Sequence, residues 1–151
     1  MTAKIILFSF AITAILIMAI YFISSPSYEK SIQAKYYYEI GEYKKAYSLA
    51  NESFDLNQYN RMASTVMAQS KISLEYVLFI DEAKKYMNTI NEIATNDIIS
   101  TSDKAKIKMM CEIVIGNYTK LASSIITDSN LTDSASNYNA MFEKLLEKVT
   151  K

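Results

Sequence analysis

Few residues in this 151-residue sequence are of the kinds that carry out acid–base, nucleophilic or metal chemistry. The chain has no histidine, the commonest general base and metal ligand near neutral pH, which removes most hydrolase triads and most zinc sites. Asp81 and Glu82 are adjacent carboxylates, but neighbouring side chains on a helix diverge, so we expect them on a solvated face near Lys84 and Lys85. Cys111, the only cysteine, lies in the apolar segment KIKMMCEIVI and is expected to be a buried, inert thiol. We therefore expect no catalytic residue, no metal site, no cofactor and no enzymatic activity.

Three consecutive tyrosines, Tyr36, Tyr37 and Tyr38, are the most conspicuous aromatic cluster. On a helix they point about 100° apart, so they cannot form one flat patch. Tyr37 is expected to pack inside the domain. Tyr38 is interpreted in the same way, as ordinary helix packing, with a peptide-binding aromatic as the alternative because tyrosine is enriched in binding hot spots.

The composition favours helices joined by short connections. The chain has two glycines and one proline, too few turn residues for a β-sandwich or a doubly wound fold. Sixteen basic residues balance sixteen acidic ones, which argues against the basic face that nucleic-acid binding needs. No phosphate loop or cofactor fingerprint is present, so no small-molecule substrate is expected either.

Residues 5–23, IILFSFAITAILIMAIYFI, contain no charge. As a helix they would span roughly 28 Å, close to the hydrocarbon thickness of a bilayer, and Pro26 would end or redirect that helix. The sequence therefore predicts a tail at 1–4, a transmembrane anchor at 5–24, a linker at 25–27 and a helical domain at 28–151. A cleaved signal peptide whose cleavage site ends at Ser27 is the alternative; its usual apolar region is shorter.

The charges around this segment give a weak orientation signal. Lys4 precedes it, and Glu29, Lys30 and Lys35 follow it. We expect a single-pass protein of the inner (cytoplasmic) membrane, with a cytoplasmic N-terminus and a periplasmic helical domain. A cytoplasmic domain is the alternative.

The remaining sequence contains an internal repeat. The segment GEYKKAYSLANESFDL begins at Gly41, and GNYTKLASSIITDSNL begins at Gly116, 75 residues later. Midway lies FIDEAKKYMNTINEI, in which Ala83 follows Ala46 by 37 residues. A fixed period of this length is typical of a helical solenoid. The matching positions are Gly41/Gly116, Tyr43/Tyr118, Lys45/Lys120, Ser48/Ser123 and Leu56/Leu131.

At these residues the chain resembles the tetratricopeptide repeat (TPR) family. The motif has a glycine between two helices, an aromatic residue two positions later and an alanine three further on, which here are Gly41, Tyr43 and Ala46. Glycine would close the interhelical turn with positive φ, and small residues would let the helices approach closely. The middle unit lacks the glycine. The resemblance implies that the repeat-defining packing residues are Ala34, Gly41, Tyr43, Ala46, Leu56, Ala83, Gly116, Tyr118 and Leu121.

The composition, the apolar segment and this resemblance together predict an all-α fold: a transmembrane helix, then a short right-handed α-solenoid of about three degenerate TPR-like pairs and a C-terminal capping helix. A capped end is what terminal repeats need. The expected helices are 27–40, 42–56, 58–75, 79–96, 102–115, 118–127 and 133–149, with N-caps at Ser102 or Asp103 and at Thr132 or Asp133.

In TPR proteins the first helix of each pair lines a binding groove. By that analogy the partner-binding residues are Tyr28, Ser31, Lys35, Tyr38 and Glu39 in the first unit, with Met110 and Ile113 in the third. The last two are apolar, so either the C-terminal helix covers them or they form an interface.

The function expected from these features is a non-enzymatic, membrane-anchored scaffold or adaptor that binds other proteins. Fold-level analogy points to a structural subunit of a bacterial envelope complex of the secretion, pilus or flagellar-motor type. The alternative is a secreted periplasmic chaperone-like TPR module released by signal-peptide cleavage.

Overall fold

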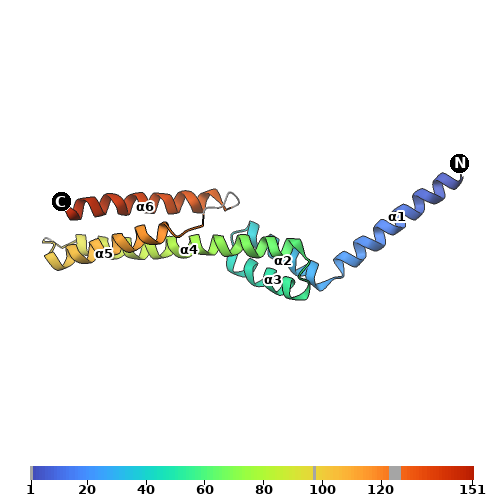
Figure 1. Cartoon of the computed structure of the whole chain (residues 1–151), viewed down its shortest axis with the longest axis horizontal. Coiled ribbons are helices and arrows are strands. Elements are labelled where there is room, and N and C mark those ends of the chain that lie inside the picture. Colours follow the sequence, from blue (N-terminus) through green and yellow to red (C-terminus); the bar gives the residue numbers. More distant parts are fainter. Residues whose placement is uncertain (1, 97, 123–126) are drawn as a thin grey trace. The chain divides into compact units, whose positions relative to one another are not determined.

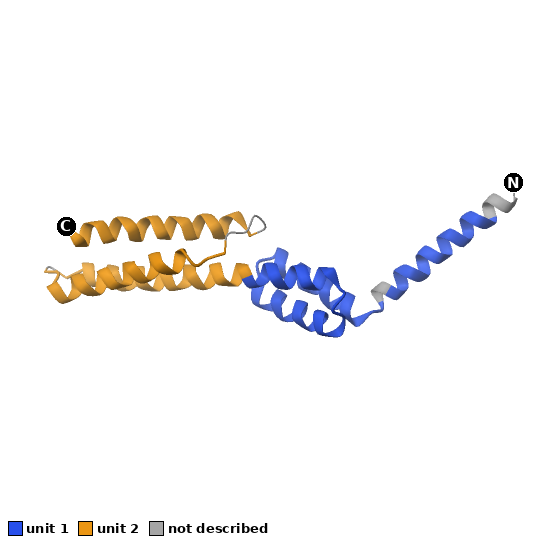
Figure 2. Cartoon of the chain, viewed as in Figure 1, with its two compact units in different colours: residues 1–71 blue, residues 72–151 orange. Residues whose placement is uncertain are grey.

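The computed structural model describes residues 2–96, 98–122 and 127–151. Within these residues all regular secondary structure is helical, with six helices and no strand, which confirms the all-α prediction (Figure 1). The chain forms two compact units, Met1–Lys71 and Ile72–Lys151 (Figure 2). The helices are α1 (Thr2–Ile23), α2 (Pro26–Glu39), α3 (Tyr43–Leu56), α4 (Arg61–Ala94), α5 (Thr101–Tyr118) and α6 (Ser129–Thr150).

Helix α1 exposes every one of its side chains from Ile6 to Tyr21. The hydroxyl of Thr13 donates to the Ser9 carbonyl at 2.9 Å, so this polar group is satisfied within the helix itself. By length and composition, no single helix of the described residues is sufficient to cross a membrane. The stretch Ile6–Tyr21 reaches that length only together with α2, across a bend of 74°.

The first unit contains the expected helix pair as α2 and α3. Pro26 occupies the first position of α2, where its missing N–H costs nothing. Gly41 closes the turn between the helices with a φ of +82°, as predicted. Gly41 N donates to Tyr38 O at 3.1 Å and Glu42 N to Tyr37 O at 2.9 Å, the two hydrogen bonds of a Schellman motif.

Small residues form the centre of this first unit. Ala34, Ala46 and Ala50 have no exposed surface, and Val66 from the first turns of α4 packs with them. Tyr43 is also buried, so Ala34, Tyr43 and Ala46 all lie in the packed interior of the first unit. The buried series on α3 is Tyr43, Ala46, Ala50 and Ser53.

Leu56 does not share this inward face. Its side chain is 56% exposed, so the prediction that it packs inside the repeat is wrong. The reason is the helical period. The buried residues of α3 share one face of the helix, and a further step of three residues from Ser53 places Leu56 to one side of that face.

The two helices predicted at 58–75 and 79–96 are one helix. Helix α4 runs without interruption for 34 residues, from Arg61 to Ala94. No glycine or proline occurs at 76–78 to end it, and Tyr76, Phe79 and Ile80 continue its buried face. Ala83 is fully buried, as expected, but inside this long helix. The middle helix pair implied by the TPR resemblance is therefore wrong.

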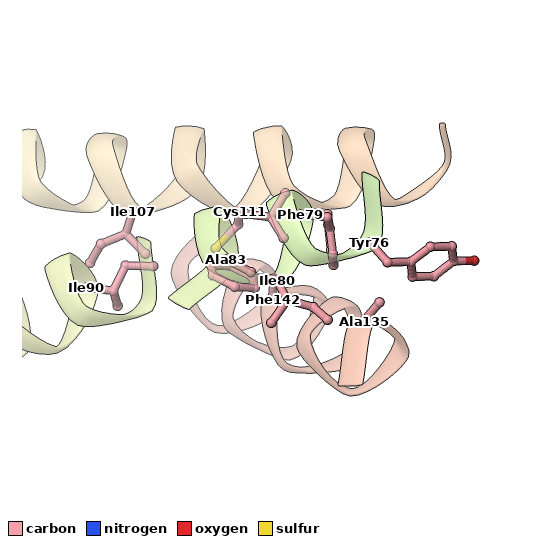
Figure 3. Packing of buried hydrophobic residues seen from close by; sticks show 10 residues of the cluster. Tyr76, Phe79, Ile80, Ala83, Ile90, Ile107, Cys111, Ala135 and Phe142 are labelled. Carbon is pink, nitrogen blue, oxygen red and sulfur yellow. The ribbon is translucent and has the colours of Figure 1, made fainter. Parts of the chain in front are cut away.

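The second unit is built from the later part of α4 with α5 and α6. Ile80, Ala83 and Ile90 of α4 meet Cys111 of α5 and Phe142 of α6 in one apolar cluster (Figure 3). Cys111 and Phe142 have no exposed surface. The other buried members are Tyr76, Phe79, Ile107, Val114 and Ala135. The predicted C-terminal helix thus supplies part of this core.

Three boundaries in this unit differ from the sequence prediction. The N-cap of α5 is Ser100, whose Oγ accepts from Asp103 N at 3.1 Å. The N-cap of α6 is Asp128, whose Oδ1 accepts from Asn130 N at 2.9 Å. Gly116 lies inside α5, and Gly41 is the only glycine with positive φ. The prediction that Gly116 closes an interhelical turn is wrong. The helix expected at 118–127 does not begin at 118, because α5 ends there and 119–122 are not helical; its residues 123–126 lie outside the described residues.

Candidate functional site

The groove residues predicted in the first unit do not share one accessible surface. Lys35 and Glu39 are exposed, and Tyr28 is half-buried. Ser31 is completely buried, so it cannot contact a partner. Tyr38 is half-buried, and its ring lies edge-on to that of Tyr43 with 5.5 Å between centroids, which favours the packing interpretation.

The two groove residues predicted in the third repeat belong to the second unit. Met110 is half-buried against the apolar cluster of that unit, so its role is packing. Ile113 is 37% exposed and lies on α5. Tyr118 and Leu121 also pack against the cluster, although without the interhelical turn predicted at Gly116, and Tyr118 lies 5.8 Å from Phe79 between ring centroids.

The other two consecutive tyrosines are also held by local contacts. Tyr37 is half-buried against the alanine-rich centre of the first unit, as expected. The Lys45 ammonium lies 3.9 Å from the centroid of its ring, a cation–π contact. Tyr36 lies edge-on to Tyr37 at 5.4 Å, while its own side chain is 60% exposed.

A buried polar cluster, missed by the sequence analysis, joins α2, α3 and α4. Its centre is Asn60, which is 1% exposed. Asn60 Nδ2 lies within hydrogen-bonding distance of Ser27 Oγ (3.0 Å), Ser31 Oγ (3.2 Å) and Ser53 Oγ (3.3 Å). Asn60 Oδ1 accepts from Ala63 N at 3.2 Å and so caps α4. Because these groups satisfy one another in the interior, the cluster is structural.

A cleft of about 290 Å³ opens on the second unit between α4 and the end of α5. Its apolar lining includes Phe79, which is buried, and Leu78, which is 66% exposed. Asn117 Nδ2 donates to Glu82 Oε2 at 3.0 Å, which holds that carboxylate at the cleft. The remaining lining residues are Glu75, Lys120 and Leu121. Apolar walls beside two carboxylates and one ammonium suit an extended peptide with apolar and basic side chains.

The chemically reactive residues offer no converging arrangement. Cys111 is fully buried, and burial, with a smaller effect of the Glu112 carboxylate, raises the pKa of its thiol. Asp81 is exposed and forms a 3.9 Å ion pair with Lys84, as expected for a solvated face. Within the described parts of the chain, no three Cys, Asp or Glu side chains come together in a way that could hold a metal ion.

Helix α2 and its C-cap residue, Ile40, carry an exposed apolar ridge, which we define as Ile32, Tyr36 and Ile40. These side chains are 55%, 60% and 53% exposed. Their spacing of four residues places them on one side of the helix. This spacing is visible in the sequence, although the TPR analogy predicted Ser31, Lys35 and Glu39 as the exposed contacts of α2 instead.

No protein-family model matches this sequence, and the comparisons with curated proteins and with solved structures also returned no match. The described surfaces that bear on function are α1, the cleft and the α2 ridge.

Proposed function

We propose that the protein is a non-enzymatic, membrane-anchored scaffold, held in a bilayer by α1 and binding other proteins through its helical units. The observation that carries this proposal is the continuous exposure of α1 from Ile6 to Tyr21. Apolar surface of that extent is covered in the cell by lipid or by protein. The internal hydrogen bond of Thr13 to Ser9 suits a lipid surrounding, where no water satisfies a hydroxyl.

The position of Ser27 supports an anchor that stays attached over a cleaved signal peptide. Ser27 is 3% exposed, and its hydroxyl donates to the Ser53 carbonyl at 2.9 Å. Cleavage after Ser27 would remove this residue from the Asn60 cluster, together with Pro26 at the start of α2. The folded first unit uses residues that the alternative would discard.

For protein binding we propose the cleft of the second unit. It combines the exposed Leu78 with fixed polar groups at Glu82 and Asn117. The α2–α3 pair, with Gly41 in its turn, supports describing the first unit as TPR-like. By analogy with such modules, the proposed setting is a structural role in a bacterial envelope complex of the secretion, pilus or flagellar-motor type, with the helical units in the periplasm.

The anchor is tested by expressing the full-length chain and extracting its membranes with alkaline carbonate. We expect the protein in the pellet with the intact mass of the complete chain. Recovery in the soluble fraction after loss of about 27 N-terminal residues would contradict the anchor and favour the secreted module.

Orientation has a separate test. In a Met109→Cys variant, the new cysteine replaces a side chain that is 62% exposed, whereas Cys111 is fully buried. A membrane-impermeant maleimide should label this variant in spheroplasts if the units are periplasmic. Labelling only after lysis would place them in the cytoplasm.

Protein binding through the cleft is tested with a photoreactive amino acid at Leu78, in native membranes. The matched control is the same amino acid at Met109, which lies in the same unit and is 62% exposed, against 66% for Leu78. We expect a discrete crosslinked partner from position 78 alone. Equal capture from both positions would move the interface away from the cleft, and no capture from either would contradict the scaffold.

A further inference from the structure

The α2 ridge lies opposite the face by which α2 enters the first unit. Ser27, Ser31 and Ala34 are the buried residues of α2. At 100° per residue, the ridge of Ile32, Tyr36 and Ile40 is centred roughly 170° away from them. It extends over about 12 Å of helix. The ridge is therefore a second apolar face of α2, which points away from the interior of the unit.

The junction between α1 and α2 fixes where this face begins. Ser24 N still donates to Ile20 O at 2.9 Å, and Glu29 N already donates to Ser25 O at 3.1 Å. Helical hydrogen bonding thus ends at Ser24 and starts again at Ser25. The end of α1 at Ile23 and the start of α2 at Pro26 are three residues apart. Because three residues cannot span more than about 10 Å, the first turn of α2 lies close to the end of α1.

The direction of α2 adds a second constraint. The axis of α2 is bent by 74° from that of α1. With α1 inserted across the bilayer as proposed, a bend of this size directs α2 along the bilayer surface and not onward through it. Isoleucine and tyrosine are the residue types that enter the headgroup region, tyrosine because its ring is apolar and its hydroxyl polar.

The charges beside the ridge also bear on its partner. Glu29, three residues before Ile32 and in line with the ridge, accepts a hydrogen bond from Gln33 Nε2 at 3.1 Å. Lys35 and Glu39 are exposed on one side of the ridge. This mixture has no positive excess. Contact with a bilayer would therefore depend on apolar burial and not on anionic lipids.

We propose that the α2 ridge lies against the surface of the bilayer, with Ile32, Tyr36 and Ile40 inserted at the headgroup level beside the anchor. This inference rests on the proposed insertion of α1 and adds that the first unit lies flat on the membrane along α2. The anchor and the ridge then hold the unit at two points.

The absence of tryptophan allows a direct test. Full-length single-tryptophan variants are reconstituted in zwitterionic phosphatidylcholine vesicles whose acyl chains are brominated near the glycerol end, so that bromine quenches a nearby indole. Tyr21→Trp, on the exposed surface of α1, reports on the anchor. Ile32→Trp and Tyr36→Trp report on the ridge, and circular dichroism checks that each variant is folded. The aqueous control is Ala68→Trp, since Ala68 is exposed on α4, turned away from the buried Ala63 and Val66.

We expect loss of intensity and a blue-shifted emission at Ile32→Trp and Tyr36→Trp as well as at Tyr21→Trp, with Ala68→Trp unchanged. Adding anionic lipid should not increase the quenching. Quenching at Tyr21→Trp alone would overturn the ridge proposal and leave the anchor standing, as would protein crosslinks from position 36 in place of lipid contact. No quenching at Tyr21→Trp would refute the anchor, and this inference with it.

One alternative pose has its own reporter. Tyr59 is 93% exposed and adjoins Asn60, which is bonded to Ser27 in the first turn of α2. If Tyr59→Trp is quenched and Tyr36→Trp is not, the first unit contacts the bilayer through the loop at Tyr59 and not along α2. The proposal that α2 lies flat on the membrane is then wrong.

Discussion

Asn60 Nδ2 lies 3.0 Å from Ser27 Oγ and so joins the N-cap of α4 to the first turn of α2. The same amide group reaches Ser31 and Ser53, while its oxygen accepts from Ala63 N. One side chain therefore both caps a helix and satisfies the buried hydroxyls of two others. Because the donor (Nδ2) and the acceptor (Oδ1) of Asn60 serve different partners, a mutation can remove one role and keep the other.

Asn60→Asp should destabilise the first unit although aspartate caps a helix as well as asparagine does. The carboxylate keeps the acceptor for Ala63 N but places a buried negative charge where the NH₂ donor was, facing Ser27 and Ser53. We expect a loss of about 2–4 kcal/mol, because a buried polar group without its donor bears the desolvation cost. Urea unfolding followed by circular dichroism measures the loss.

The control is Asn57→Asp in the same loop. Asn57 Oδ1 only accepts, from Tyr59 N at 3.0 Å, and a carboxylate can do the same. We expect a change within about 0.5 kcal/mol. Equal losses for the two variants would show that the amide donor of Asn60 contributes nothing.

The two glycines should respond to alanine with opposite signs. Gly41 has a φ of +82°, and a Cβ there would meet no atom within 4 Å, so the cost of Gly41→Ala is backbone strain of about 1–2 kcal/mol. Gly116 also has open space around it but lies inside α5. Gly116→Ala should therefore stabilise the second unit by about 0.5–1 kcal/mol.

Thermal unfolding of the two variants beside the original chain tests this pair. Destabilisation by Gly116→Ala would mean that Gly116 serves a turn after all, as the repeat pattern had indicated. A neutral Gly41→Ala would show that the turn after α2 tolerates a side chain.

The two glycines also show which parts of the fold could be predicted from the sequence. The local pattern around Gly41 predicted the turn, the α2–α3 pair and the burial of Ala34 and Ala46. Transferring that pattern to Gly116 failed, because a helix tolerates glycine at a modest cost and the neighbours of Gly116 favour helix. In the same way, the repeat period predicted a boundary between helices 58–75 and 79–96. Residues 76–78 include no glycine or proline that would end a helix, so α4 continues through them.

The candidate surfaces were harder to predict than the helices. Ser31 is polar and was expected in a groove, but it is buried because Asn60 and the Tyr28 carbonyl, 2.9 Å from its hydroxyl, provide partners. Whether a polar residue finds such partners depends on tertiary contacts between helices. The cleft at Leu78 likewise depends on the approach of α5 to α4, which no local pattern specifies.

Tyr76 should make the second unit sensitive to alkaline pH. Its hydroxyl donates to Ala122 O at 3.2 Å, and burial, with a smaller contribution from Tyr118, raises its pKa above the ordinary value of 10. Since the folded state disfavours the phenolate, this contribution to stability is complete below pH 10 and is lost as the pH rises above it.

Tyr76→Phe separates the two effects. At neutral pH the variant should lose about 1 kcal/mol with the hydrogen bond. Its melting temperature should then fall less steeply than that of the original chain in alkaline buffers. Tyr59→Phe, at a side chain that is 93% exposed, is the control. Parallel pH curves for Tyr76→Phe and the original chain would refute the role of Tyr76.

The Lys30–Glu52 pair should contribute in the opposite pH range. Lys30 Nζ lies 2.6 Å from Glu52 Oε2, and this hydrogen-bonded charge lowers the pKa of the Glu52 carboxyl below its ordinary 4.5. The lowered pKa means that the contribution is present above that pH and is lost as acid protonates the folded carboxylate. Glu52→Gln should lower the melting temperature slightly at neutral pH, and the difference should vanish in acid. A difference that persists in acid would point to packing instead.

Cys111 should report on unfolding of the second unit and on nothing else. Its thiol has no exposed surface, and burial raises its pKa, so both access and thiolate formation are suppressed in the folded state. A chromogenic disulfide reagent should leave the native protein unreacted and titrate one thiol per chain in urea. Met109→Cys, two residues away on the same helix and at a side chain that is 62% exposed, should react at once with one additional thiol. Rapid reaction of Cys111 in the native chain would show that the core of α4, α5 and α6 opens readily.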